Sequence, residues 1–539
     1  MTNSGNALKT KDLDFTAAYL AVCDIQEHIR TYPDSISSET ILALNGALKN
    51  SGFSSQTQSF FLYRETADAL ASIIVRTTSE PIAAEAVCAL KDVLGTATGN
   101  PKKATASALG SLPVLVHSPD LCEETVEDIP RAKWQDIQDI LVEKGITNCN
   151  APALIGRSLV LSIDENRLLV VKLASAEDSV QGIYREVVWM KHLCSGGYSF
   201  PVRFDIPAAI EIERSYVFRL ENIPVRMPDG TNRHPKGYAI GFVANRDYFA
   251  YPNEHRAERP LSKEQFKEIM FRNAWLFGKL TSIGIAHSAP IPLFHNRVQT
   301  NRRRDHGLYE WQRGGRLDRW LDCCCYPNFG PTGIRDFEHL IALKGTGQRP
   351  YSYIGTQILS MLLVAGSYFR NKNRAIGGLD GQGKPVDAQA LFDKPFLKEL
   401  IQGIFVGYYH GFVGTELIEE VPLDLDELTS RMIEEMGVDR YMEEILRVVD
   451  QRQMSDEEFS TFLKDRGYSE SEIRGLKRGA GDITIYTGPH LGGFNERISL
   501  PEIIESVATI SALCIADRYW KERFPEPASL PLQELSCTN

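Results

Sequence analysis

The sequence lacks any long hydrophobic run. Its longest apolar stretch, Ile358–Phe369, is too short to cross a bilayer, so we expect no membrane span and a buried helix at that place. The first residues, Met1–Asn6, lack the basic and apolar regions of a secretory signal, so we expect no signal of the Sec type. These features predict a cytoplasmic protein, or a secreted effector that leaves the cell without a Sec signal.

The chain also lacks an excess of positive charge and any zinc-type cysteine spacing. Its 539 residues carry a net charge of −11, with an isoelectric point near 5.6, which argues against general nucleic-acid binding. None of the ten cysteines forms a C-x-x-C pair, and the consecutive thiols of Cys323–Cys325 cannot easily chelate one metal. Free thiols suit a reducing cytoplasm. The glycine-rich stretch Gly479–Gly493 lacks a Walker lysine and predicts a loop.

Residues 1–147 predict an all-helical N-terminal domain. Short Pro, Gly, Asn or Ser breaks separate helical segments expected at Asp14–Tyr32, Ser38–Lys49, Gln56–Thr77, Pro81–Ala97 and Pro101–Val114. Small residues with Leu and Val at turn spacing suit HEAT-like helix pairs, and a generic helical bundle fits equally well. No titratable cluster stands out, so we expect a docking or regulatory module.

Two short apolar runs, Leu154–Ile163 and Leu168–Leu173, flank a polar turn and predict a β-hairpin. Lys172 lies inside the second run. The stretch Gly182–Met190 has helical spacing, and its Glu186 is the natural ion-pair partner of Lys172. In the alternative interpretation, Lys172 extends from a strand edge to solvent and Glu186 lies on a solvated helix face.

An amphipathic helix expected at Phe271–Ser282 leads into the loop Ile283–Pro290. In many phosphotransferases such a helix positions a His-x-Asp loop, whose Asp takes the proton of the attacking hydroxyl. His287 occupies the histidine position, but Ala289 stands where the Asp belongs, and alanine cannot accept a proton. His287 is therefore a candidate catalytic residue, or else a core histidine that ties the loop to the backbone.

The stretch Gly333–His339 predicts a strand and a turn that contain the dipeptide Asp336-Phe337. Protein kinases place an Asp followed by an aromatic residue where its carboxylate binds the Mg²⁺ of ATP. Lys172, Glu186 and Asp336 thus follow one another in the order of a protein-kinase-like core.

Further residues make the chain resemble the SidJ-related pseudokinases, whose founding member is a Legionella effector that uses ATP to attach glutamate to protein side chains. Arg157 lies fifteen residues before Lys172, and Asn328 lies eight residues before Asp336. Arg316 follows the altered catalytic loop within a basic segment. The resemblance spans about residues 150 to 345, and its specificity lies in the joint order and spacing.

The resemblance implies ATP and Mg²⁺ as cofactors. The implied catalytic residues are Lys172, Glu186, His287, Arg316 and Asp336. The implied nucleotide-binding residues are Arg157, Lys172, Asn328 and Asp336, and the implied metal ligands are Asn328, Asp336 and Glu338. The family carries a second acidic residue three positions after the metal Asp, where this chain has His339, so neighbouring Glu338 is the candidate substitute.

We therefore expect an α+β fold with a protein-kinase-like two-lobed core, an N-terminal all-α HEAT-like domain and a mostly helical C-terminal region. The expected boundaries are 1–147 for the helical domain, 148–245 for the N-lobe, 246–425 for the C-lobe with a basic insertion, and 426–539 for the C-terminal region. Strands are expected at Tyr216–Leu220 and Tyr238–Val243, the second as the lobe-connecting hinge, and helices at Leu425–Leu476 and Ile503–Arg523.

The segment His295–Arg319 is basic within an acidic chain. Its arginines are Arg297, Arg302, Arg303, Arg304, Arg313, Arg316 and Arg319. They suit recognition of phosphates, an adenylate or an acidic substrate, or they pair with the acidic surface elsewhere.

Three functions follow from these patterns. In the first, a protein substrate's acidic side chain is adenylated from ATP and passed to an amine such as free glutamate; a carboxylate is already ionised and needs no base, which fits Ala289. The second is an ordinary kinase with a displaced base, Asp305 or Asp318. The third is a non-catalytic nucleotide-binding scaffold. The founding member's activator is calmodulin, but Ile25–Arg30 only partly matches an IQ motif, so calmodulin is not predicted.

Overall fold

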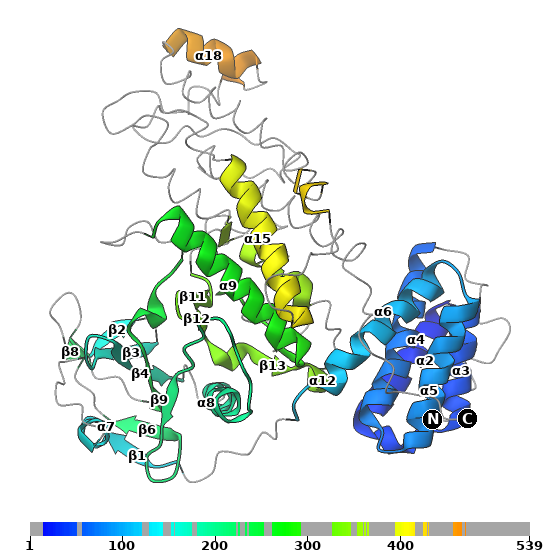
Figure 1. Ribbon diagram of the computed structural model, residues 1–539, viewed down its shortest axis with the longest axis horizontal. Helices are drawn as coiled ribbons and strands as arrows, with labels where there is room; N and C mark the ends of the chain where they lie inside the picture. The colour runs from blue at the N-terminus through cyan, green and yellow to red at the C-terminus, as the bar shows by residue number, and fades with distance from the viewer. Residues whose placement is uncertain are drawn as a thin grey trace.

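The structure is a computed structural model of the chain. It describes residues 15–50, 56–120, 129–143, 152–155, 157–174, 180–221, 225–226, 232–233, 237–252, 261–292, 326–346, 353–358, 360–362, 364–365, 394–414, 424–427, 429–430, 456–465 and 469–470. The fold is α+β, with an N-terminal helical region and a curled sheet on opposite sides of the view in Figure 1. None of the described helices combines the length and the apolar character needed to cross a membrane.

The N-terminal helices match their expected bounds to within two residues. They are α2 Phe15–Thr31, α3 Ser38–Lys49, α4 Gln56–Arg76, α5 Glu80–Thr96 and α6 Asn100–Val116, with a short 3₁₀ turn η1 at Pro33–Ser35. Pro81 and Pro101 lie in the first turns of α5 and α6, where a missing N–H costs no helical hydrogen bond. Ala, Leu, Val and Ile side chains on the inner faces form a core of their own.

The sheet has seven strands in the order β1-β6-β9-β4-β3-β2, with β5 paired to β9. Their bounds are β1 Arg131–Lys133, β2 Ala153–Ile155, β3 Ser158–Ser162, β4 Arg167–Leu173, β5 Ala208–Ile210, β6 Val217–Glu221 and β9 Gly237–Asn245. The expected hairpin is confirmed as β3 and β4, whose register pairs Ser158 with Lys172. A separate small pair joins β7 Val225–Arg226 to β8 Asn232–Arg233.

Alternation along β4 gives the sheet two buried faces. Leu168 and Val170 belong to the core under helix α8 (Val180–Ser195), whereas Leu169 and Val171 belong to the core under helix α7 (Trp134–Glu143). Successive strand side chains point to opposite faces, so Lys172 shares the face of Val170 and looks toward α8.

Two expectations about this region are wrong. Residues 131–143 were assigned to the N-terminal domain, but β1 pairs with β6 and α7 packs on the sheet. Residues 238–243 were expected to form the hinge, but they lie inside β9, between β4 on one side and β6 and β5 on the other. Backbone groups engaged on both edges are not free to connect domains or hold a ligand. The chain leaves the sheet only after Asn245, through the 3₁₀ turn η3 at Arg246–Phe249.

Beyond the sheet, two long helices pack tightly together: α9 (Lys263–Ser282) and α15 (Lys394–Val413). A Cβ added at Gly278 would lie 2.2 Å from the carbonyl oxygen of Tyr408, so the backbones approach closely there. Helix α9 begins eight residues before the expected Phe271, because Ser262 and Gln265 form a reciprocal capping box. Residues 353–358, near the expected buried helix, are helical, and Ile358 is buried.

Two short strand pairs flank the loop and the turn that contain several of the candidate site residues. Strand β10 (Ile285–His287) pairs with β13 (Leu340–Ala342), and β11 (Phe329–Gly330) pairs with β12 (Gly333–Ile334). The 3₁₀ turn η5 (Phe337–His339) joins β12 to β13, and a single turn α12 (Leu343–Thr346) follows. In the C-terminal region the structure describes α18 (Asp456–Asp465). The glycine-rich segment 479–493 and the helix expected at 503–523 lie outside the described residues.

Helix α6 extends from the N-terminal helices to α12 and also contacts α9 (Figure 1). Its residues Ala104 to Leu112 contribute to the N-terminal core, whereas Val114 belongs to the core around α9. Just beyond it, the buried Ser118 hydroxyl donates to the carbonyl of Gly284 at 2.9 Å and accepts from the N–H of Lys344 at 3.0 Å. One side chain therefore joins the segments that precede β10 and follow β13.

Replacing Gly284 with alanine should destabilise this junction. Gly284 has φ +77°, and a Cβ there would lie 2.2 Å from the Cα of Ser118, so left-handed strain adds to a backbone clash. We expect a loss of about 2–5 kcal/mol in the free energy of unfolding, measured by urea denaturation with tryptophan fluorescence. The control Gly182→Ala, in open space on α8, should leave stability unchanged or raise it by up to about 1 kcal/mol. Superimposable curves for the wild type and Gly284→Ala would contradict the constraint.

Candidate functional site

The candidate site centres on the ammonium group of Lys172. Its Nζ lies 2.6 Å from Oε2 of Glu186 and 2.5 Å from Oδ1 of Asp336. Glu186 reaches it from α8, where Ile183, Val187 and Met190 bury the same helix against the sheet. The ion pair expected between Lys172 and Glu186 is present, and the alternative of a solvated pair is wrong because both side chains are buried. Their roles in catalysis remain predictions.

Asp336 adopts a backbone conformation that non-glycine residues rarely take. Its φ of 60° and ψ of 56° are left-handed, a region that Asp tolerates better than most residues. This conformation ends β12 and starts η5, and it directs the carboxylate toward Lys172. Phe337 anchors the turn in the core, because it is fully buried and stacks on Phe204 with ring centroids 6.0 Å apart. Strained backbone of this kind is concentrated at functional sites.

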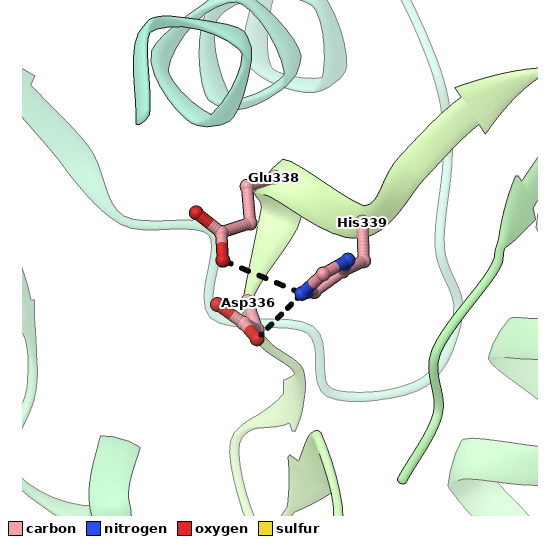
Figure 2. Close-up of side chains that lie close together, drawn as sticks. All are labelled: Asp336, Glu338 and His339. Carbon is pink, nitrogen blue, oxygen red and sulfur yellow. Dashed lines mark ion pairs between the residues drawn. The ribbon is translucent and has the colours of Figure 1, made fainter. Parts of the chain in front are cut away.

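Two more side chains of the same turn complete the cluster (Figure 2). Glu338 accepts a hydrogen bond from Arg157, and its Oε2 lies 3.6 Å from Nζ of Lys172. Nε2 of His339 lies 3.4 Å from Oδ2 of Asp336 and 3.3 Å from Oε1 of Glu338. Strand β4, helix α8 and the turn at η5 thus bring Lys172, Glu186 and Asp336 together, and Arg157, just before β3, contacts Glu338 from 181 positions away in the chain.

The charged groups of the cluster differ in how burial and neighbouring charges shift their pKa values. Burial opposes the charge of Lys172, but Asp336, Glu186 and Glu338 together raise its pKa far above the ordinary value. Burial raises the pKa of Glu186, and repulsion from Asp336 and Glu338 raises it further. Because Lys172 lowers this pKa by less, the pKa of Glu186 reaches about 7. Burial would also raise the pKa of Glu338, but Lys172, His339 and Arg157 lower it to about 2. The ammonium is therefore firmly charged, and Glu186 ionises less readily than Glu338.

The surroundings of His287 do not suit a catalytic residue, because the side chain is buried and both ring nitrogens are bonded to the backbone. It has no exposed surface, its Nε2 is bonded to the carbonyl of Arg335 at 2.9 Å, and its Nδ1 accepts from the N–H of Ala289 at 3.2 Å. This geometry favours the alternative in which His287 ties the loop to the backbone, and it argues against a direct catalytic role. Asn328 holds the same loop, because its Nδ2 donates to the carbonyl of Ala289 at 2.8 Å.

Arg335 and Tyr248 are structural partners of the site that the sequence did not indicate. The guanidinium of Arg335 is buried, donates to the carbonyls of Pro327 and Tyr248, and lies 4.2 Å from the ring centroid of Tyr251. Burial lowers its pKa. Tyr248 is also buried, and burial raises the pKa of its hydroxyl. These contacts fix the segment after β9 against Arg335, between β12 and Asp336.

Some predicted site residues lie outside the part of the chain that the structure describes. Arg316, the other arginines of 297–319, and the candidate bases Asp305 and Asp318 lie outside the described residues, as does the run Cys323–Cys325. Among the described residues, Asp336, Glu338 and His339 place their ligand atoms within 4.8 Å of one another, the spacing of a potential metal site. The carboxylates of Asp336 and Glu338 fit a hard cation such as Mg²⁺, whereas the His339 nitrogen is not a donor that Mg²⁺ prefers.

Comparisons with known proteins do not assign the chain to a family. No protein-family model matches it, and no curated protein matches it at a significant level.

Changing Arg335 to lysine should cost more stability than a surface arginine does. A lysine cannot replace several guanidinium N–H donors, so at least one buried carbonyl loses its partner. We expect about 2–4 kcal/mol lower free energy of unfolding, from urea denaturation followed by tryptophan fluorescence. The control Arg203→Lys changes an exposed pair with Asp205 and should have little effect. Equal stability of the two variants would refute the anchoring role.

Proposed function

We propose that the protein is an ATP- and divalent-metal-dependent transferase with a protein-kinase-like core. The observation that carries the proposal is the buried contact of Lys172 with both Glu186 and Asp336. A lysine held by a helix glutamate and facing an aspartate on a strand turn is the arrangement by which kinases hold ATP phosphates and their metal. Buried groups with strongly shifted pKa values, such as Lys172 and Glu186, are also frequent at functional sites.

The fold is compatible with two lobes. In this proposal the seven-stranded sheet with α8 forms the smaller lobe, and α9, α15 and the short strand pairs form the larger one. The segment 246–252 would connect them. The N-terminal helices would serve as a HEAT-like docking platform, which is consistent with the contact of Ser118 and Lys344.

Residue roles follow from the contacts. Lys172 and Arg157 would bind the phosphates of ATP. In the structure these two side chains contact Asp336 and Glu338, and they would give up part of those contacts when ATP binds. Asp336 and Glu338, with the amide of Asn328, would hold the metal, whose chemistry is to neutralise charge on the phosphate oxygens. Glu186 would position Lys172, and His287 would position the loop. Arg316 remains a candidate for binding the anion.

The reaction proposed is transfer through an acyl-adenylate. Ala289 is fully buried and carries no proton acceptor, so a hydroxyl substrate would lack its usual base. A carboxylate of a protein substrate is already charged: its oxygen attacks the α-phosphorus of ATP, and the bond to pyrophosphate breaks. An amine such as free glutamate then attacks the acyl carbon, a C–N bond forms, and AMP leaves with the bonding electrons while the amine loses a proton. This assignment follows the resemblance to SidJ-related pseudokinases.

The products of ATP turnover test the proposal. With ATP labelled at the α- or the γ-phosphate, a divalent metal, glutamate and a cell lysate as acceptor, we expect AMP and pyrophosphate. Lys172→Met should lower turnover by at least about 10³-fold, because phosphate positioning is lost.

The matched control is Lys191→Met, which removes an exposed lysine over the Tyr216 ring and should retain turnover. Circular dichroism checks that both variants fold. Formation of ADP and a phosphorylated protein would identify an ordinary kinase instead. Nucleotide binding without any turnover would identify a scaffold.

A further inference from the structure

An ion pair joins the turn between β2 and β3 to the turn η5. Arg157 lies in the first of these turns, which is tight because Ile155 and Ser158 are register partners. The carbonyl of Arg157 accepts from the N–H of Leu173 at 3.0 Å, so the backbone of this turn is tied to the last residue of β4. Its guanidinium donates to Oε1 of Glu338 in η5. The ion pair therefore bridges the sheet and the turn that follows β12.

Glu338 contacts two cationic side chains with its two oxygens. Oε1 accepts from Arg157, and Oε2 lies 3.6 Å from Nζ of Lys172. The side chain of Glu338 is only 12% exposed, and that of Arg157 is 35% exposed. A pair with so little access to water is screened less by salt and solvent than a surface pair. The carboxylate of Glu338 is therefore a strong local partner for both cations.

Arg157 is the cation whose carboxylate contact is most readily exchanged. Lys172 also has Glu186 at 2.6 Å and Asp336 at 2.5 Å, so it keeps two carboxylates when Glu338 moves away. In the described part of the chain, the ion pairs give Arg157 one carboxylate, that of Glu338. Movement of Glu338 would thus free the guanidinium for another anion, while the buried centre around Lys172 stays intact.

The chemistry of the guanidinium lets a phosphate take the place of Glu338. Arginine binds carboxylate and phosphate oxygens through the same planar fork of N–H groups. A carboxylate of the same chain competes at a high effective concentration, because the fold keeps it near its partner. Any phosphate that uses the same N–H group of Arg157 must displace this carboxylate.

We propose that Glu338 is an internal competitor of the phosphates, and that its ion pair with Arg157 is a latch that keeps the unliganded site in a state of low affinity. The inference deepens the proposed function by adding a regulatory contact, and it rests on that function for the identity of the anion. The latch opens when phosphate oxygens replace the carboxylate of Glu338 on Arg157. The apparent dissociation constant is then the intrinsic constant divided by the fraction of molecules whose latch is open.

The test is the binding of inorganic pyrophosphate to the full chain, measured by isothermal titration calorimetry in EDTA. Neither metal binding nor turnover contributes under these conditions. Glu338→Gln keeps the size of the side chain and removes the charge that holds the latch. We expect this variant to bind pyrophosphate at least about tenfold more tightly than the wild type, since a latch closed in about nine molecules of ten lowers the apparent affinity by this factor.

Two further variants separate the latch from the general effect of removing a negative charge. Glu338→Asp keeps the charge but shortens the side chain by one methylene, so it should still bind pyrophosphate at least about threefold more tightly than the wild type. The matched control is Glu221→Gln, which removes the same charge from a glutamate paired with Arg131 outside the cluster and should leave the affinity unchanged. Circular dichroism checks that each variant folds.

The latch is overturned if Glu338→Gln or Glu338→Asp binds pyrophosphate no more tightly than the wild type, or if Glu221→Gln gains as much as Glu338→Gln. Absence of pyrophosphate binding in the wild type and all variants would overturn it as well. These outcomes differ from failure of the proposed function, since that failure appears in the products formed from ATP. Tighter binding by both Glu338 variants in a protein that makes no AMP would retain the latch and remove the transferase.

Discussion

The structure around the candidate site depends on one buried ammonium group. Lys172 comes from the middle of a sheet, Glu186 from a helix and Asp336 from a turn, and the three meet within hydrogen-bond distance. Charges so close in a poorly solvated place interact far more strongly than at a surface, and none of them is tolerable alone. The relative placement of β4, α8 and η5 is therefore set by charge as well as by the apolar core on the same face.

The turn that presents Asp336 is held from several sides. Phe337 is packed on Phe204, Ser288 binds the carbonyl of His339, and Arg335 fastens the preceding strand to the segment after β9. Because these anchors surround a left-handed residue, its strain is maintained by the fold around it and not by its local sequence. The N-terminal helices reach the same region through Ser118, whose hydroxyl is bonded to Gly284 and Lys344 on either side of the β10–β13 pair.

Much of this arrangement could be predicted from the sequence where the periodicity was strong. The N-terminal helices, the β3–β4 hairpin and α8 were predictable because apolar spacing and Pro or Gly breaks define them. The pairing of Lys172 with Glu186 was expected from the kinase-like order of a strand lysine followed by a helix glutamate, and the structure contains it. The placement of β1 and α7 could not be predicted, because a strand of three residues in a parallel edge pair is too short to show a hydrophobic period. Arg335 was missed for another reason: its partners are backbone carbonyls, which leave no trace in side-chain types.

The loop residue Ala289 connects the proposed chemistry to the fold. Its carbonyl accepts from Asn328 and its N–H donates to His287, so the backbone keeps an ordered loop although the side chain offers no base. Within the described cluster, the carboxylates of Glu186, Asp336 and Glu338 already face Lys172 or Arg157. None of the three is then well placed to remove a proton from a neutral nucleophile. In the proposed reaction, this composition is the physical reason for preferring a carboxylate acceptor, which arrives charged, to a hydroxyl.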